Sequence, residues 1–169
     1  MKKVFRICIY LNVVMLLVAC TSSSSGEATI KKYEIKNDGK TITTLGIQQA
    51  INECSANGGG IVTLPAGDYL TGTIILKKNV TLHLEKGAKI SGVEDIAHYP
   101  DKVRRKALIF ADHADNIAIT GEGEINGNGY FINNGNDAPN RPTLVLLFDC
   151  KNVKVDGVKM TNSAFWTFR

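Results

Sequence analysis

A short phrase occurs three times in this chain at a nearly fixed interval. Its copies begin at Asn79, Asn116 and Asn152, which lie 37 and 36 residues apart. In each copy an asparagine precedes alternating aliphatic and other residues, and a glycine and a second short aliphatic pair follow. A fixed period of roughly 20–50 residues is typical of stacked repeats, and repeats composed only of short strands favour a solenoid of β-coils. We therefore expect an all-β chain wound as a solenoid.

The expected strands are short, with glycine, asparagine or aspartate at their ends. Such strands can turn a corner and return one layer up, about 4.8 Å from the coil beneath. The recurring asparagines then stack as a hydrogen-bonded ladder, or they occupy turns that asparagine tolerates, and the two interpretations are compatible. The expected strands are 61–64, 69–70, 73–76, 80–84, 88–90, 108–111, 117–120, 144–148, 153–155 and 158–160.

One amphipathic helix, over 45–56, is expected ahead of the strands. Its apolar residues recur at helical spacing, Thr44 is the candidate N-cap, and the glycines at 58–60 end the helix. A terminal coil of a solenoid needs a polar cover, so we interpret this helix as an N-terminal cap. A turn is expected before it, at 37–39. The apolar stripe consists of Ile47, Ala50, Ile51 and Cys54.

The repeat is longer than one coil of three short strands requires. The excess lies in two polar, proline-containing segments, 93–106 and 128–142. Insertions of this kind in a solenoid gather on one face, which is often the binding face. We expect both segments to be loops that extend from the coils.

The first 20 residues have the pattern of a targeting segment. They carry three basic residues and no acidic residue, followed by an apolar run over 7–18 that is shorter than the roughly 20 residues of a membrane-spanning helix. The ending Leu17-Val18-Ala19-Cys20 resembles a bacterial lipobox, which implies cleavage before Cys20 and lipidation of its sulfur. Two or more acyl chains anchor a protein stably. Plain secretion and an uncleaved anchor are the alternatives.

These features divide the chain into three parts. We expect a lipoprotein signal peptide over 1–20 with lipid-modified Cys20, a flexible serine-rich tether over 21–32, and a domain over 33–169. The expected location is the cell envelope or the exterior of a bacterium, with the protein held as an outer-membrane or surface lipoprotein.

The charge balance argues against a nucleic-acid-binding protein, and the cysteine content gives no disulfide framework. Three of the 20 basic residues lie in the signal segment, which leaves 17 against 16 acidic residues, far from the basic footprint of a nucleic-acid-binding protein. Of the four cysteines, Cys54 and Cys150 remain in the domain. Export permits a disulfide, but one pair gives no framework, and two small buried apolar side chains are the favoured interpretation.

Longer phrases resemble a known family. Residues 46–51 and 59–72 resemble the opening of right-handed parallel β-helix proteins of the pectin-lyase type. Residues 117–129 are similar to the Thr-Gly-x-Gly-x-Ile-Asp-Gly-x-Gly phrase of the polygalacturonases, glycoside hydrolase family 28, and the likeness continues from Arg141-Pro142 to Trp166. Asn126 stands where the family usually has aspartate and Ala164 where it has proline. The likeness covers about 40–169.

The resemblance implies inverting hydrolysis of α-linked galacturonic acid polymers, with pectic polysaccharide as the partner. We expect a monomer that needs no cofactor or metal. The family's catalytic aspartates lie in motifs that follow the Asn-Ser-x-x-Trp phrase, here 162–166. They would therefore lie beyond Arg169, and no catalytic residue is assigned. We expect the chain to carry the cap and first coils of a β-helix that is incomplete at its C-terminus, and to be inactive alone.

Two other functions compete with this one. A polysaccharide lyase on the same fold would use calcium held by clustered carboxylates and a basic residue that removes a proton, and the sequence shows no tight acidic cluster. A non-catalytic, carbohydrate-binding surface lipoprotein is the third possibility.

Several charged residues are interpreted as structural. Asp112, His113 and Asp115 precede a repeated asparagine and are expected in a turn. Glu122 and Glu124 flank a glycine and are expected in a solvated turn.

The remaining polar and aromatic candidates stay open. His83, His98 and His113 share no spacing of metal ligands. Phe165 and Trp166 can stack on sugar or pack in the core. A basic run in the first loop either meets a polyanion or is simply solvated, which we favour. It consists of Lys102, Arg104, Arg105 and Lys106.

Overall fold

The computed structural model describes residues 29, 31–100, 105–132 and 140–169. The expected signal peptide with Cys20, most of the expected tether, and the basic residues Lys102 and Arg104 lie outside these described residues. In the described part of the chain, no helix has both the length and the apolar character needed to cross a membrane.

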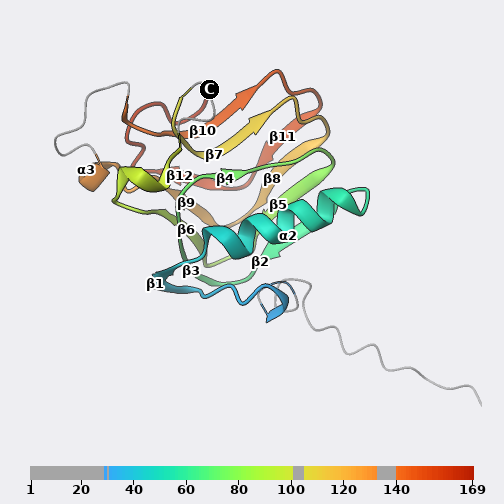
Figure 1. Cartoon of the computed structure of the whole chain (residues 1–169), viewed down its shortest axis with the longest axis horizontal. Helices are drawn as coiled ribbons and strands as arrows, with labels where there is room; N and C mark the ends of the chain where they lie inside the picture. Colours follow the sequence, from blue (N-terminus) through green and yellow to red (C-terminus); the bar gives the residue numbers. More distant parts are fainter. Residues whose placement is uncertain (1–28, 30, 101–104, 133–139) are drawn as a thin grey trace, which may run out of the picture.

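The chain winds through three parallel sheets, each of which receives one strand per coil (Figure 1). Sheet A has the order β1-β3-β6-β9-β12, sheet B the order β11-β8-β5-β2, and sheet C the order β10-β7-β4. The right-handed parallel β-helix expected from the sequence is confirmed. The strands are β1 (Asp38–Ile42), β2 (Gly60–Leu64), β3 (Gly67–Thr71), β4 (Ile74–Ile75), β5 (Val80–Leu84), β6 (Ala88–Gly92), β7 (Ala107–Asp112), β8 (Ile117–Gly121), β9 (Glu124–Asn126), β10 (Thr143–Phe148), β11 (Val153–Asp156) and β12 (Lys159–Thr161).

Strand register explains the length of the repeat. Val62 of β2 pairs with Leu82 of β5, 20 positions later, and Leu82 pairs with Ile119 of β8, 37 positions later. A bare coil therefore needs about 20 residues, and the remainder of the longer repeat is inserted sequence. The insertions are 93–106, which contains the short 3₁₀ helix η1 (Ile96–His98), and 127–142, which contains α3 (Gly129–Ile132).

The core is the interior of the coils. Aliphatic side chains from all three sheets point inward, among them Leu82, Ile90 and Ile109, each with none of its surface exposed. Each such side chain contributes roughly 1.5–3 kcal/mol by burial. The last coil differs, because Val153 and Val155 of β11 are 38% and 37% exposed although they pair with buried residues of β8.

The asparagine ladder is present at the corner between sheets C and B. The amide of Asn116 donates to Oδ1 of Asn79 at 2.9 Å, and the amide of Asn152 donates to Oδ1 of Asn116 at 2.9 Å. All three residues have positive φ, at 62°, 56° and 53°. Both interpretations of the repeated asparagine, ladder and turn, are therefore confirmed.

Helix α2 (Thr44–Ala56) lies against the first coil, at the opposite end of the stack from β10 and β11 (Figure 1). Ile47, Ala50 and Ile51 of the expected stripe are buried, and Cys54 is partly buried against the same core. Gly58 and Gly59 follow the helix with φ of 98° and 109°, as a glycine ending requires. The expected N-terminal cap is confirmed.

Two local expectations near this helix are wrong in detail. Thr44 is the first helical residue rather than the N-cap, and Thr43 in the capping position makes no side-chain capping bond. The Thr44 hydroxyl instead accepts from the backbone N–H of Gly72 at 2.8 Å, which ties the helix start to the coil. The turn expected at 37–39 overlaps strand β1, although Gly39 does have a φ of 67°.

A helical turn precedes these elements. Thr29, Lys31 and Lys32, at the end of the expected tether, are helical, and the backbone N–H of Tyr33 donates to the carbonyl of Thr29 at 3.2 Å. Flexibility of 21–28 stays a prediction.

Candidate functional site

The corner between sheets A and C collects every long insertion of the described coils. Gly72 crosses it tightly, whereas in the next two coils 93–106 and 127–142 are inserted between the sheet A strand and the sheet C strand. A Cβ at Gly72 would lie 2.3 Å from the carbonyl oxygen of His98, and one at Gly127 would lie 2.6 Å from that of Asn162. Only glycine permits so close a stacking of these crossings. The expectation that the insertions gather at one face is confirmed.

The first insertion is anchored by Tyr99. This side chain is 1% exposed, and its hydroxyl donates to the carbonyl of Val93 at 2.8 Å. Burial raises the pKa of Tyr99 well above its ordinary value. The ammonium of Lys106 donates to the carbonyl of Tyr99 at 2.8 Å, and Lys106 is only 9% exposed. The expectation of a solvated loop is therefore wrong for Lys106, because its charge satisfies a buried carbonyl.

Arginine and aromatic side chains meet at this corner. The guanidinium carbons of Arg105 and Arg141 lie 5.8 and 5.7 Å from the ring centre of Phe165, within the range of a cation–π interaction. Trp166 packs edge-on to Phe165, with ring centres 5.5 Å apart. We call these four residues the arginine–aromatic cluster. Phe165 is partly buried and Trp166 is 54% exposed.

The cluster carries positive charge without a counterion in the described structure. None of the described carboxylates forms an ion pair with Arg105 or Arg141. The Nε atom of Arg141 is buried and has no hydrogen-bond partner among the described residues. A buried donor without a partner costs stability.

Sequence reasoning did not single out Arg141 as a site residue or connect it to Arg105. The two arginines are 36 residues apart, which is the interval of the repeat, and each stands two positions before a sheet C strand that pairs in register. Because their separation equals the repeat interval, the two arginines could have been predicted to lie in successive coils.

The outer face of sheet A carries a row of alternating charges. Asp68, Lys89, Glu124 and Lys159 occupy the same register position in successive strands. Lys89 lies 3.7 Å from Asp68, and Lys159 lies 3.9 Å from Glu124, measured between the nearest charged atoms. Both carboxylates are thus engaged in ion pairs.

The structure separates the two glutamates that flank Gly123. Glu122 is exposed at a bend, as expected of a solvated turn. Glu124 is not in a turn, because it belongs to strand β9, and its carboxylate accepts from the hydroxyl of Thr161 at 2.6 Å.

The turn expected at Asp112, His113 and Asp115 is confirmed for His113 and Asp115, whereas Asp112 is the last residue of strand β7. His113 has a φ of 49°, and its ring nitrogens lie 2.6 Å from Asp112 and 3.0 Å from Asp149. Asp115 accepts from the backbone N–H of Lys151 at 2.9 Å. Among the described residues, no group of three histidine, cysteine or acidic side chains is arranged to hold a metal.

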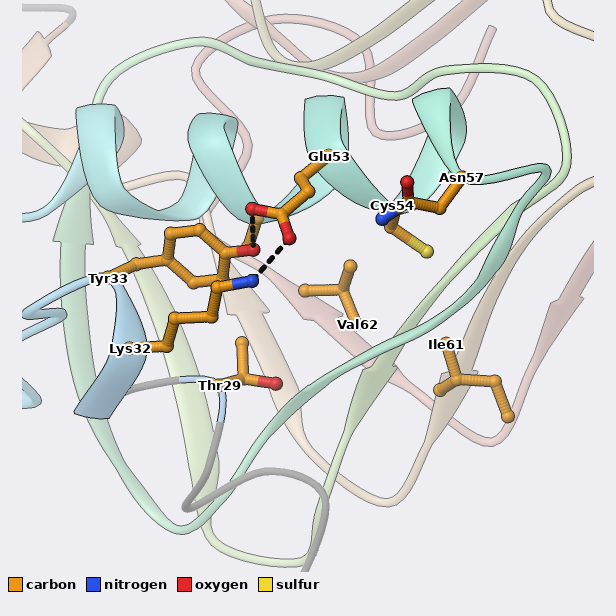
Figure 2. A pocket seen from close by; sticks show the side chains of 9 residues that line it. Thr29, Lys32, Tyr33, Glu53, Cys54, Asn57, Ile61 and Val62 are labelled. Carbon is orange, nitrogen blue, oxygen red and sulfur yellow. Dashed lines mark hydrogen bonds and ion pairs between the residues drawn. The ribbon is translucent and has the colours of Figure 1, made fainter.

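A pocket of about 250 Å³ lies beside α2, at the N-terminal end of the stack (Figure 2). Glu53 of α2 points toward the Tyr33 hydroxyl, which donates to it at 2.7 Å, and also pairs with Lys32. The hydrogen bond from Lys32 is the main cause that lowers the pKa of Glu53. These polar groups satisfy one another. The hydrogen bonds from Lys32 and Tyr33 to Glu53 therefore attach the N-terminal turn to helix α2.

Cys54 lines the same pocket, and desolvation raises the pKa of its thiol. Cys54 and Cys150 are both free and partly buried. The described structure has no disulfide between them, and their partial burial differs from the fully buried side chains expected.

Three parallel sheets around one core, with a helix over the first coil, define the chain as a right-handed parallel β-helix protein. Residues 54–169 match the family model of the glycosyl hydrolases family 28. The chain belongs to this family.

Similar proteins share the family and the fold. An exo-poly-alpha-D-galacturonosidase of Dickeya chrysanthemi is 36% identical over 118 residues, which cover 60% of this chain and 19% of that protein. The family 28 exopolygalacturonase of Yersinia enterocolitica has a TM-score of 0.72 and 28% identity, covering 80% of this chain and 35% of that one. A protein from Parabacteroides merdae has a TM-score of 0.75 and 33% identity, and the match covers 80% of this chain and 64% of that chain. The chain thus spans only part of these relatives.

Proposed function

We propose that the protein hydrolyses pectic polysaccharide, cleaving α-linked galacturonic acid with inversion at the anomeric carbon. The observation that carries this proposal is the family match over 54–169, joined to the likeness in fold to an exopolygalacturonase. The proposed reaction needs no cofactor or metal, because the chemistry of an inverting glycosidase needs only two carboxyl groups and water. The monomeric state is part of the same proposal.

The fold suits that chemistry. In an inverting glycosidase one carboxylic acid protonates the leaving oxygen and a carboxylate activates water on the opposite face, with about 6.5–9.5 Å between them. Side chains one or two layers apart on a parallel sheet differ in height by about 4.8 or 9.6 Å. A rigid stack of coils can therefore hold two carboxyl groups at the required separation.

We place the catalytic aspartates in coils that stack on β10, β11 and β12, beyond Arg169. The exposed aliphatic side chains of Val153 and Val155 support this placement, because a further coil would bury them as β11 buries those of β8. In this proposal 33–169 provide the cap and the first coils of the glycosidase domain.

We also propose that the protein is a lipoprotein of the bacterial cell envelope, anchored through Cys20 and separated from the membrane by a flexible tether. The pattern of the first 20 residues supports this proposal. In cells grown with a labelled fatty acid, the protein should carry the label and the Cys20→Ser variant should not. Label retained by that variant would contradict the proposed anchor.

The activity is tested on the whole protein with polygalacturonate. We expect reducing ends to appear without an unsaturated product, and proton NMR to show the inverted anomer first. An unsaturated uronate would instead identify a lyase, and binding without product would identify a non-catalytic protein. Either result would overturn the proposed hydrolysis.

The isolated chain 1–169 should release no reducing sugar from polygalacturonate, because the proposed catalytic carboxylates are outside it. Measurable release by this chain alone would contradict that placement.

A further inference from the structure

Strand β4 is the last strand of sheet C at the N-terminal end of the stack, so among the described residues it has a strand on one side only. The backbone N–H of Leu76 donates to the carbonyl of Phe110 on β7, the paired strand, at 2.8 Å. The backbone groups of the preceding residue, Ile75, are directed to the other side of β4. Backbone groups at such an edge are a template on which the strand of another chain can pair.

The side chain of Gln48, on helix α2, occupies this edge. Its Oε1 accepts from the backbone N–H of Ile75 at 2.8 Å, and its Nε2 donates to the carbonyl of Ile75 at 2.9 Å. Nε2 also donates to Oδ1 of Asn52 at 3.0 Å. A side-chain amide has the same kinds of donor and acceptor as a peptide group. Gln48 therefore makes the two hydrogen bonds that a neighbouring strand would make.

Other side chains of α2 continue this contact along the coil. The hydroxyl of Thr44 accepts from the backbone N–H of Gly72 at 2.8 Å, and the hydroxyl of Ser55 donates to the carbonyl of Lys78 at 3.0 Å. Thr44, Gln48 and Ser55 recur at intervals of four and seven residues, so they lie on one side of the helix. This polar side of α2 follows the free edge before, at and after β4.

Sheet A ends at the same end of the stack with strand β1, and the carboxylate of Asp38 occupies backbone donors there. Its Oδ1 accepts from the backbone N–H groups of Lys40 and Thr41, at 2.9 and 2.8 Å. The pairing of β1 with β3 is irregular between Asp38 and Ile42, and Gly39 has a φ of 67°. An irregular strand whose donors are already bonded is a poor template for a further strand.

We propose that Gln48 and Asp38 act as surrogate strand residues, which keep the N-terminal edges of sheets C and A from pairing with a second copy of this chain. A second copy presents the same backbone edges, and a two-fold pairing of like edges closes at a dimer. The inference goes beyond the proposed function, because the proposed catalytic carboxyl groups lie at the other end of the stack.

Amide hydrogen exchange in the whole protein tests the role of Gln48. Gln48→Leu keeps a side chain of similar size and removes both bonds to Ile75. The amide of Ile75 should then exchange at least about tenfold faster than in the parent protein. Gln49→Leu is the matched control, because it makes the same change at an exposed position of the same helix and should leave that rate unchanged. An unchanged rate in Gln48→Leu, or an equal rise in Gln49→Leu, would overturn the role of Gln48.

Sedimentation velocity over a range of concentrations tests the association, with all proteins in one detergent because of the proposed lipid anchor. The parent and Gln49→Leu should remain monomeric. Gln48→Leu should form dimers, and the double variant Asp38→Ala/Gln48→Leu should associate at least about tenfold more tightly than Gln48→Leu alone. Asp38→Asn keeps an oxygen that can accept from the two N–H groups and should remain monomeric.

Circular dichroism confirms that each variant is folded. Faster exchange of the Ile75 amide in a double variant that stays monomeric at every concentration would overturn the self-association surface. Association of the parent as tight as that of the double variant would overturn it as well. Neither measurement depends on whether the whole protein hydrolyses polygalacturonate, so failure of the proposed function would leave this inference intact.

Discussion

Asn116 combines two properties at one position of the ladder. Its φ of 56° is in the left-handed region, and its amide bonds to Asn79 on one side and Asn152 on the other. Few side chains tolerate this backbone conformation, and fewer also provide both a donor and an acceptor. The repeated asparagine therefore sets the corner and joins successive coils.

Replacement of Asn116 should separate the two contributions. Asn116→Gly keeps the backbone conformation and loses the two exposed hydrogen bonds, so the free energy of unfolding should fall by about 1 kcal/mol. Asn116→Ala should lose about 2 kcal/mol, since alanine also bears the left-handed strain. Urea unfolding measures both values. Equal losses in the two variants would show that the backbone conformation is not a constraint.

Asp38 should make stability depend on acid pH. Hydrogen bonds from the backbone N–H of Thr41, then from that of Lys40, lower its pKa from 3.8 to about 2. Because the folded-state pKa is depressed, this stabilisation is present above pH 3.8 and is lost as the pH falls through about 2.

The Asp38→Asn variant should therefore show a weaker decline of the melting temperature between pH 4 and pH 2 than the parent chain. Thermal unfolding followed by circular dichroism at closely spaced pH values measures this decline. Identical pH profiles for the two proteins would mean that Asp38 is not hydrogen-bonded as described.

Helix α2 acts as a cover, and its two faces provide a matched comparison. Ile51 has no exposed surface, whereas Leu45, on the same helix, is 72% exposed. Ile51→Ala should reduce the free energy of unfolding by about 3 kcal/mol through lost burial and a cavity. Leu45→Ala should change it by less than about 0.5 kcal/mol. Comparable losses in urea unfolding would contradict the role of α2 as a cap.

The sequence predicts strands and helix well because their signals are local or periodic. The aliphatic alternation after Asn79 and Asn116 predicts β5 and β8 nearly to the residue. The errors come from tertiary partners. Lys106 is buried, and its ammonium donates to the carbonyl of Tyr99. Glu124 is part of a strand because it pairs with Lys89 of the coil beneath.

Recognition of the candidate site needed the register of the coils. Phe165 is distant in sequence from both Arg105 and Arg141. Only the winding of the coils brings its ring close to the two guanidinium groups. The interval between the two arginines equals the repeat, but charged loop residues carry no hydrophobic pattern that would select them. That Arg141 Nε has no partner among the described residues is likewise a property of packing, which composition does not encode.

The whole molecule depends on stacking in one register, and β5, β8 and β11 test it directly. Thr81 pairs with Ala118, and Ala118 pairs with Lys154, so Thr81 and Lys154 lie two layers apart on the outer face of sheet B. Spin labels at Thr81→Cys and Lys154→Cys, in a chain whose four native cysteines are replaced by serine, should be separated by about 10 Å, twice the strand spacing. Electron paramagnetic resonance should show strong dipolar broadening in the doubly labelled chain. A spectrum equal to the sum of the two singly labelled chains would contradict the stacked coils.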